Sequence, residues 1–331
     1  MAALHTSPSF VPTSGLTTLR RGLALRNMGL LVLVNALWAL QYPASRVAIA
    51  QLPPLTLTVV CLSLACLLVL PVAVRRTRQR QVAQPQTGAF WAAFAAASLL
   101  GLIPAVGLLA WGESKVGASR AALIGLSTPV LTGLVAWPLL GERLTLVRLI
   151  GLVVSLSGGL WLSLAQPGDG TALSSGEAPT QAALGLALVL GSCLSSAIYN
   201  TLAKRVLTVW SGVELIAYSY LVATGAGLIA VAWFEPGAVN ALRALTVRGW
   251  VAMAVLAAFP WALAMLLWFR ALARLDVTVA SLSTYLLPAF GVILSALFLR
   301  EPLTWAVVPG ALLTLAGALL VMRFDARAAE P

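Results

Sequence analysis

PVLTGLVAWPLLGERLTLVRLIGLVVSLSG occupies residues 129–158 and decides how the chain folds, because it recurs 159 residues later. The second copy, PAFGVILSALFLREPLTWAVVPGALLTLAG, occupies residues 288–317. Each copy is an apolar run, a short charged hairpin and a second apolar run. A repeat of this period in an apolar chain predicts two homologous halves within a membrane. Four pairs of residues coincide in the two copies: Pro129 with Pro288, Glu142 with Glu301, Gly151 with Gly310, and Gly158 with Gly317.

The composition is that of a membrane protein. Of the 331 residues, 60% are hydrophobic and 9% are charged, and the mean hydropathy is +0.95. A soluble domain carries about 25% charged residues, so lipid must be the main solvent of this chain. The net charge of +11 lies mostly in short loops between apolar runs. There it sets membrane topology, and we expect no nucleic-acid partner.

Nothing in the sequence predicts a metal centre, a cofactor or an enzyme. Cys61, Cys66 and Cys193 lie inside apolar runs without metal-ligand spacing, and the single histidine, His5, is in the N-terminal tail. No glycine-rich phosphate loop is present, which argues against direct ATP coupling. We therefore predict a protein without cofactors that is not an enzyme.

Ten apolar segments have the length of roughly 20 residues that a membrane-spanning helix needs. We predict a cytoplasmic tail (1–27), a first five-helix repeat (28–165), an external linker rich in Gly, Ser and Pro (166–182), a second five-helix repeat (183–323) and a cytoplasmic tail (324–331). The first apolar run is too long for a secretory signal. The expected spans are 28–50, 54–74, 88–111, 116–139 and 146–165, then 183–204, 212–234, 249–270, 277–299 and 304–323.

The orientation follows from the positive residues. With both termini in the cytoplasm, most of the Lys and Arg residues, including the block RRTRQR at 75–80, fall on the cytoplasmic side. Five spans in each half is an odd number, so the second half must enter the membrane inverted. The hairpin at Glu142 is then cytoplasmic and the hairpin at Glu301 external. Inverted repeats serve alternating access, with a site near the midplane between the halves.

The same motifs resemble a known family. GLLVLVNALWALQYPASRVAI (29–49), LLAWGESKVGASRAAL (108–123) and the two P-x12-E-x8-G-x6-G blocks are similar to EamA-type members of the drug/metabolite transporter superfamily. The resemblance implies an all-α integral membrane protein of ten helices, with both termini inside and export of small metabolites.

Polar side chains on one face of a span should face a wet cavity or another helix, because polar groups are costly in hydrocarbon. For the small Ser and Thr residues, hydrogen bonds between packed helices, of about 0.6 kcal/mol each, are the alternative to cavity lining. The larger Gln41, Tyr42, Tyr199 and Asn200 favour a cavity. The three stripes are Asn35, Trp38, Gln41, Tyr42 and Ser45; Ser192, Ser195, Ser196, Tyr199 and Asn200; and Ser281, Thr284, Tyr285 and Pro288.

Two further residue types extend the candidate site. Trp38 and Trp261 lie deep in their spans and could stack on a ligand or gate a path, whereas Trp111, Trp161, Trp233 and Trp250 are expected at the interfaces. Glu214 is the carboxylate closest to a span interior and is the candidate for proton coupling. Its alternative role is that of a solvated glutamate at a helix start.

Four other charged positions have structural interpretations. We assign Glu142 and Glu301 to hairpin and helix-start structure, and we expect Arg46 and Lys204, which align under the repeat at an offset of 158, to snorkel at opposite ends.

The sequence predicts a secondary transporter of the inner (plasma) membrane that exports a small polar or amphipathic metabolite, such as an amino acid or a related compound. Its partners are the small-molecule substrate and the bilayer, and homodimer formation stays open. An importer or facilitator of a nucleoside or drug-like solute is the first alternative. A membrane-embedded lipid-modifying enzyme is a distant one, because no cluster of Asp, Glu or His is present at one membrane face.

Overall fold

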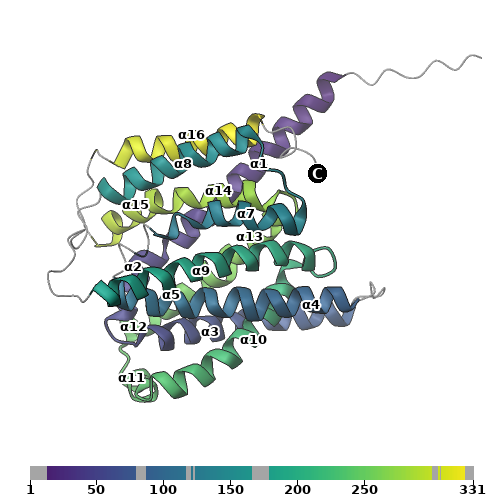
Figure 1. Cartoon of the computed structure of the whole chain (residues 1–331). Helices are drawn as coiled ribbons and strands as arrows, with labels where there is room; N and C mark the ends of the chain where they lie inside the picture. The colour runs from purple at the N-terminus through teal and green to yellow at the C-terminus, as the bar shows by residue number, and fades with distance from the viewer. Residues whose placement is uncertain are drawn as a thin grey trace, which may run out of the picture.

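The structure, a computed structural model, describes residues 13–79, 87–116, 121, 124–165, 179–299, 305 and 307–324. This part of the chain is helical and contains no strands (Figure 1). The α-helices are α1 (Thr13–Ala39), α2 (Gln41–Ile49), α3 (Pro54–Gln79), α4 (Gly88–Ala96), α5 (Ile103–Val116), α7 (Thr128–Leu140), α8 (Leu146–Ala165), α9 (Pro179–Val206), α10 (Gly212–Phe234), α11 (Ala238–Arg243), α12 (Val247–Leu256), α13 (Met265–Leu272), α14 (Val277–Leu282), α15 (Leu287–Leu299) and α16 (Val307–Phe324).

Six helical segments in the described residues are long and apolar enough to cross a membrane, which agrees with the prediction of an all-α membrane protein. They are Arg26–Ile49, Pro54–Gln79, Gly88–Gly112, Ala183–Val206, Gly212–Phe234 and Val247–Leu272. Each overlaps one predicted span. The other four predicted spans contain shorter apolar helices, namely Thr128–Leu140, Leu146–Gly158, Val277–Gly291 and Val308–Val321. The short helix α11 was not predicted.

Several of the long helices are irregular near a proline. The helix that begins with α1 is interrupted at Leu40, three residues before Pro43. A π-helical turn, η1 (Ala97–Leu102), joins α4 to α5 just before Pro104, and a second, η2 (Ala257–Ala264), joins α12 to α13 and contains Pro260. A 3-10 turn, η3 (Ser283–Leu286), joins α14 to α15 just before Pro288. Proline lacks the amide hydrogen that a regular α-helix needs, which explains why the hydrogen-bond pattern changes at these places.

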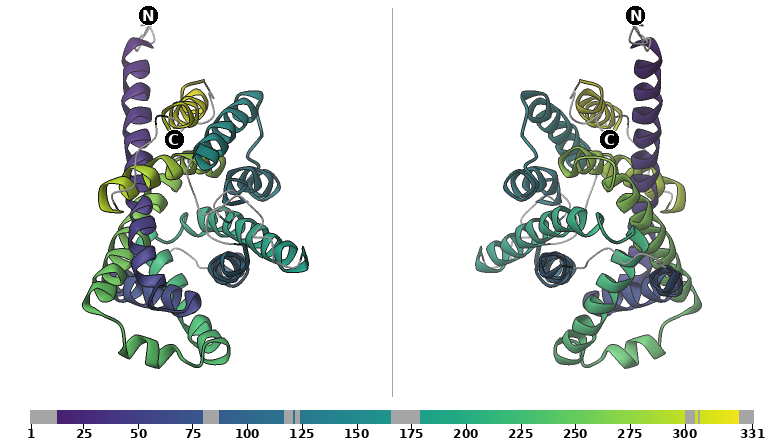
Figure 2. Two further views of the ribbon diagram at one scale, coloured as in Figure 1. Left: turned by 90° about the vertical axis from the view of Figure 1, so that its left-hand side faces the viewer. Right: turned by 90° about the vertical axis from the view of Figure 1, so that its right-hand side faces the viewer.

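Helices distant in sequence pack in pairs. The most extensive pairs are α8 with α16, α5 with α9, and α3 with α10 (Figures 1 and 2). The α8–α16 pair is brought together by glycines of the duplicated block. A Cβ on Gly317 would lie 2.7 Å from the carbonyl oxygen of Gly151 and 2.7 Å from the amide nitrogen of Ser155. The backbones therefore meet directly, as small residues at a helix–helix interface allow.

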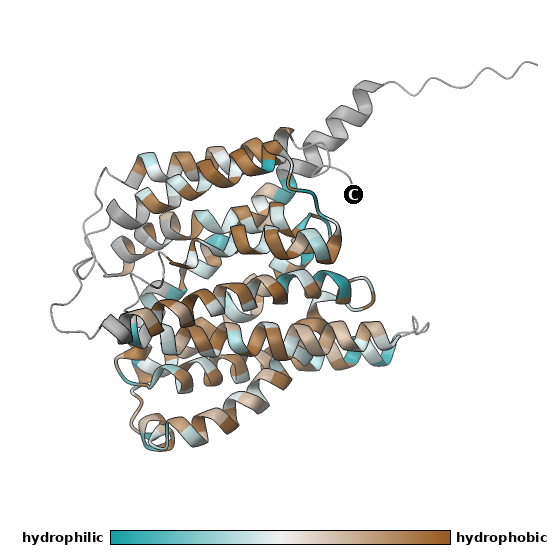
Figure 3. Ribbon diagram, in the orientation of Figure 1, coloured by the Kyte–Doolittle hydropathy of each residue, from teal (hydrophilic) through white to brown (hydrophobic). Residues whose placement is uncertain are grey.

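Apolar residues predominate along the helices (Figure 3), and many of their side chains are exposed. Leu67, Leu146 and Leu297 are among many large hydrophobic residues with exposed side chains. The four tryptophans that were expected at the interfaces, Trp111, Trp161, Trp233 and Trp250, are all exposed. So large an apolar surface is suited to contact with lipid.

We predict that Gly317→Ala lowers the stability of the folded protein by about 1–3 kcal/mol, because the added methyl group overlaps backbone atoms of α8. Thermal unfolding in detergent measures the effect. Gly225→Ala in α10 is the matched control, because a Cβ there meets no atom within 4 Å. The control should be neutral or should gain up to about 1 kcal/mol of helix propensity. Equal melting temperatures for the two variants would contradict the prediction.

Candidate functional site

Two tryptophans and an asparagine connect three helices that lie far apart in the sequence. The rings of Trp38 in α1 and Trp268 in α13 have centroids 5.2 Å apart and an interplanar angle of 48°. The indole Nε1 of Trp268 donates a hydrogen bond of 2.8 Å to Oδ1 of Asn200 in α9. The Nδ2 of Asn200 donates to the carbonyl of Ser196 one turn earlier, at 2.9 Å. Two predicted site residues, Trp38 and Asn200, are thus linked through Trp268.

Asn35 adds a buried polar group one turn before Trp38. Its Nδ2 donates to the carbonyl of Leu31 at 2.8 Å and to Oγ of Ser283 at 3.0 Å. Its Oδ1 is buried and has no hydrogen-bond partner among the described residues. A buried acceptor without a donor costs free energy, which a ligand donor would recover. We call Asn35, Trp38, Asn200, Trp268 and Ser283 the indole–amide cluster.

Tyr199 and Trp261 lie beside this cluster in the same apolar core. The ring of Tyr199 meets Phe269 edge to face, with centroids 5.8 Å apart. Its backbone is so close to η1 that a Cβ on Gly101 would lie 2.7 Å from the Cα of Tyr199. The carbonyl of Trp261, inside the π-helical turn η2, accepts a hydrogen bond of 2.8 Å from the hydroxyl of Tyr220. Both π-helical turns are therefore in contact with helices that carry candidate site residues.

Three other predicted site residues, Tyr285, Ser281 and Thr284, make their contacts outside the indole–amide cluster. Tyr285 is buried in a separate core with Leu126, Leu152 and Val321. Ser281 and Thr284 donate to carbonyls three residues earlier in their own helix. Gln41 and Ser45 are half-buried in α2, beyond the interruption at Leu40, and the side chain of Tyr42 lies outside the described part.

Trp268 and Ser283 were missed as site residues by the sequence analysis. Ser283 lies in the 3-10 turn η3, where the spacing of side chains differs from the α-helical spacing on which the predicted stripe was built. The proline at 288 was the available signal for this irregularity. Trp268 was recognised as part of its span, but the residue that it contacts in α9 could not be known from the sequence.

Glu214 lies at the start of α10 and its carboxylate is part of a capping box. Its Oε2 accepts hydrogen bonds from the amide and the hydroxyl of Ser211, both at 2.8 Å. Its Oε1 accepts from the hydroxyl of Thr77, at the end of α3, at 3.0 Å. These contacts correspond to the helix-start alternative, except that the residue is 1% exposed and therefore not solvated.

A second contact of the same kind joins the opposite ends of α3 and α10. Glu235, just after α10, accepts hydrogen bonds from the amides of Leu55 and Thr56 at 3.1 and 2.7 Å, and from the hydroxyl of Thr56 at 2.5 Å. Each end of this antiparallel helix pair is thus held by one threonine hydroxyl and one glutamate carboxylate.

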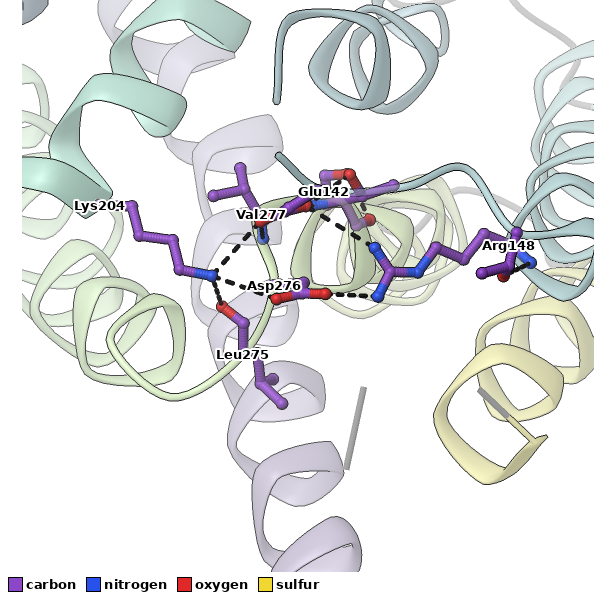
Figure 4. A network of polar contacts seen from close by, with 9 residues as sticks. Glu142, Arg148, Lys204, Leu275, Asp276 and Val277 are labelled. Atoms are coloured by element: carbon purple, nitrogen blue, oxygen red, sulfur yellow. Dashed lines mark hydrogen bonds and ion pairs between the residues drawn. The ribbon is translucent and has the colours of Figure 1, made fainter. Parts of the chain in front are cut away.

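A group of four charged side chains, which we call the charge network, lies where the α7–α8 connection meets α9 and α14 (Figure 4). It consists of Glu142, Arg148, Lys204 and Asp276. Glu142 is buried and accepts from the amides of Val277 and Thr278 at 2.7 and 3.0 Å, and from the hydroxyl of Thr278 at 2.7 Å. Its carboxylate therefore caps the first turn of α14, where the helix dipole favours a negative charge.

The two cations of the charge network bridge its two carboxylates. Lys204 Nζ lies 2.8 Å from the carbonyl of Leu275, 3.3 Å from Glu142 Oε1 and 3.4 Å from Asp276 Oδ1. Arg148 is 1% exposed, forms an ion pair with Asp276 and lies 3.9 Å from Glu142 Oε2. Lys204 is thus bound to carboxylates and does not simply snorkel. Asp276 was not singled out from the sequence, although it directly precedes a predicted span.

The comparisons with known proteins agree with this architecture. The model of the EamA-like transporter family matches residues 26–164 and 183–323, which include every residue of the indole–amide cluster and of the charge network. The chain belongs to the EamA-like transporter family. The two matched regions coincide closely with the two halves that the duplicated block predicted. Together with the apolar helices, membership in this EamA family makes the chain a multi-pass membrane protein of the transporter class.

Curated relatives within this family are transporters. A protein of Streptantibioticus cattleyicolor named "Probable terminal-alkyne amino-acid exporter" is 30% identical over 88% of this chain and 92% of its own length. The "Uncharacterized transporter YvbV" of Bacillus subtilis is 26% identical over 88% of this chain and 90% of its own. One solved crystal structure has the same fold, with a TM-score of 0.73, 19% identity, and coverage of 91% of this chain and 98% of the other.

We predict that Glu142→Ala destabilises the protein by about 3–5 kcal/mol, because it leaves Lys204 and Arg148 with one carboxylate fewer and removes the cap of α14. Thermal unfolding of the purified protein measures the loss. Arg143→Ala, at the exposed neighbouring position, serves as the control and should change the stability by less than about 0.5 kcal/mol. A melting temperature of Glu142→Ala equal to that of the control would show that the network adds nothing to the fold.

Proposed function

We propose that this protein is a secondary transporter of the inner membrane that exports a small polar or amphipathic metabolite, an amino acid or a related compound. Export would proceed by alternating access at a site between two inverted five-helix repeats, with both termini in the cytoplasm. The observation that carries the proposal is the indole–amide cluster. Its contacts Trp38–Trp268 and Asn35–Ser283 both join the first matched region to the second.

The α3–α10 contacts support the inverted arrangement of the repeats. At the offset of 158 that aligns Arg46 with Lys204, Thr56 corresponds to Glu214 and Thr77 corresponds to Glu235. The contact between Thr56 and Glu235 is therefore the counterpart of the contact between Glu214 and Thr77. Two equivalent contacts at opposite ends of an antiparallel pair are what a twofold axis in the membrane plane would produce.

The irregular helices support a site near the midplane. The π-helical turns η1 and η2 occupy similar positions in the two regions, between α4 and α5 and between α12 and α13. Transporters of the inverted-repeat type bind their substrates where helices are interrupted near mid-membrane, because the freed backbone groups can then contact the ligand. The interrupted segments at Leu40 and η3 flank the indole–amide cluster from α1 and from α14–α15.

The chemistry of the cluster suggests the class of substrate. Its five side chains are two indoles, two amides and a hydroxyl, and none of them is charged. The buried Oδ1 of Asn35 is an acceptor for a ligand N–H group. Indole rings can bind an ammonium group or an apolar side chain. A neutral or zwitterionic solute suits this lining, and the name of the Streptantibioticus cattleyicolor relative favours an amino acid.

Two alternative functions are compatible with the same residues or the same fold. An importer or facilitator of a nucleoside or drug-like solute would bind to the same indoles, because direction and coupling do not follow from the lining. A lipid-modifying enzyme is the distant alternative, which the transporter relatives disfavour.

We predict that Asn200→Ala and Trp268→Phe, which each delete the hydrogen bond between these two side chains, lower saturable amino-acid uptake into proteoliposomes by about tenfold. The measurement is the initial rate with radiolabelled amino acids at several concentrations. Trp250→Phe, at an exposed tryptophan, is the matched control and should leave the rate unchanged. Unaltered uptake in all three variants would refute the site. No saturable uptake by the wild type would direct the search to nucleosides and aromatic drugs.

Glu214 is the candidate for proton coupling, but its contacts favour the alternative of a structural role at the start of α10. Its matched control is Glu235, which makes the equivalent contact. Because the carboxylate of Glu214 is used in a helix cap and in the bond to Thr77, we expect Glu214→Gln to lower the melting temperature about as much as Glu235→Gln. We expect uptake driven by an imposed pH gradient to persist in both variants. Loss of gradient-driven uptake in Glu214→Gln alone, with exchange retained, would make Glu214 the coupling residue instead.

A further inference from the structure

Four ion pairs converge at the charge network, at one end of the interface between the two matched regions. Two of them cross the interface, namely Arg148 with Asp276 and Lys204 with Glu142. The hydrogen bonds from the amides of Val277 and Thr278 to Glu142 cross it as well. The first region cannot move away from α9 and α14 at this end without losing the contacts that cross the interface.

Because its side chains are largely buried, the charge network closes this end of the interface and is either fully formed or broken. The side chains of Arg148 and Glu142 are 1% and 5% exposed, and those of Lys204 and Asp276 are 25% and 27% exposed. Two cations and two carboxylates balance one another, so the closed arrangement leaves no net charge in a region of low dielectric constant. Removing one partner leaves a buried charge uncompensated, and the interface must then admit water or separate.

The positions that correspond to the charge network under the repeat hold a different set of residues. At the repeat offset of 159, Glu142 corresponds to Glu301, and Thr278 corresponds to Ser119. Asp276, however, corresponds to Gly117, and Arg148 corresponds to Val307. Glu301, Gly117 and Ser119 lie outside the described residues. In sequence, the carboxylate and the hydroxyl recur at the equivalent positions, whereas the two charged residues of the Arg148–Asp276 pair do not.

We propose that the charge network is the cytoplasmic gate of the transporter, and that the Arg148–Asp276 pair is a latch which makes the state closed to the cytoplasm the resting state. The inference rests on the proposed function and on the orientation given by the positive residues. An ion pair that forms at only one end of a pseudosymmetric interface stabilises the state closed at that end relative to the state closed at the opposite end. The substrate must therefore enter from the cytoplasm during brief openings of the latch.

The test measures access to a site behind the latch. Thr201 is fully buried in α9, one turn before Lys204. In a background without Cys61, Cys66 and Cys193, Thr201→Cys reports opening through its reaction with a membrane-impermeant maleimide added to inside-out vesicles. We expect Asp276→Asn to raise the labelling rate by about tenfold or more, because it removes the carboxylate charge that holds Arg148. Arg274→Gln, an exposed charge change two residues earlier, is the control and should leave the rate unchanged.

A second variant keeps the test decisive if Asp276→Asn does not reach the membrane. Lys204→Gln removes the other crossing ion pair and should also accelerate labelling, by a smaller factor, because the Arg148–Asp276 pair remains. Labelling at the rate of the control in the folded variants would overturn the proposal. Acceleration only with maleimide added to right-side-out vesicles would overturn the cytoplasmic assignment.

The labelling test is independent of the substrate. Accelerated labelling without amino-acid uptake by the unmodified protein would support the gate and refute the proposed substrate. Uptake without any change in labelling would support the transport function and refute the gate.

Discussion

Much of the packing between the two halves depends on the contacts of the Glu142 carboxylate. In hydrocarbon, unsatisfied backbone groups at a helix end and an unpaired charge both cost free energy. The side chain of Glu142 avoids both costs. It accepts the first amides of α14 and it also neutralises Lys204. Because its partners in the second matched region lie 62 to 136 residues away in the chain, it fixes the α7–α8 connection against the other half of the molecule.

Much of the architecture could be predicted, because a membrane requires long apolar helices and these appear in the sequence as apolar runs of about 20 residues. The duplicated block predicted two halves, and the apolar runs predicted where the helices lie. The site was harder to predict. Ser283 was missed because a 3-10 turn changes which side chains share a face, and the burial of Glu214 depends on Thr77, which is 137 residues away. Such long-range partners leave no periodic signal in the sequence.

The two clusters differ in their chemistry, which suits the different roles in transport that we propose for them. The indole–amide cluster is uncharged and is held by single hydrogen bonds and ring contacts, which can rearrange around a solute at small cost. The charge network is buried and multiply bonded, so it is either formed or broken.

The paired contacts of α3 and α10 have a consequence for the assembly of the chain. The first half supplies both hydroxyl groups, from Thr56 and Thr77, and the second half supplies both carboxylates, from Glu214 and Glu235. Two copies of the second half placed in the same arrangement would set carboxylate against carboxylate, and two copies of the first half would lack the acid altogether. Each half is therefore complementary to the other and not to itself, so these contacts favour the pairing of unlike halves over the pairing of two like halves.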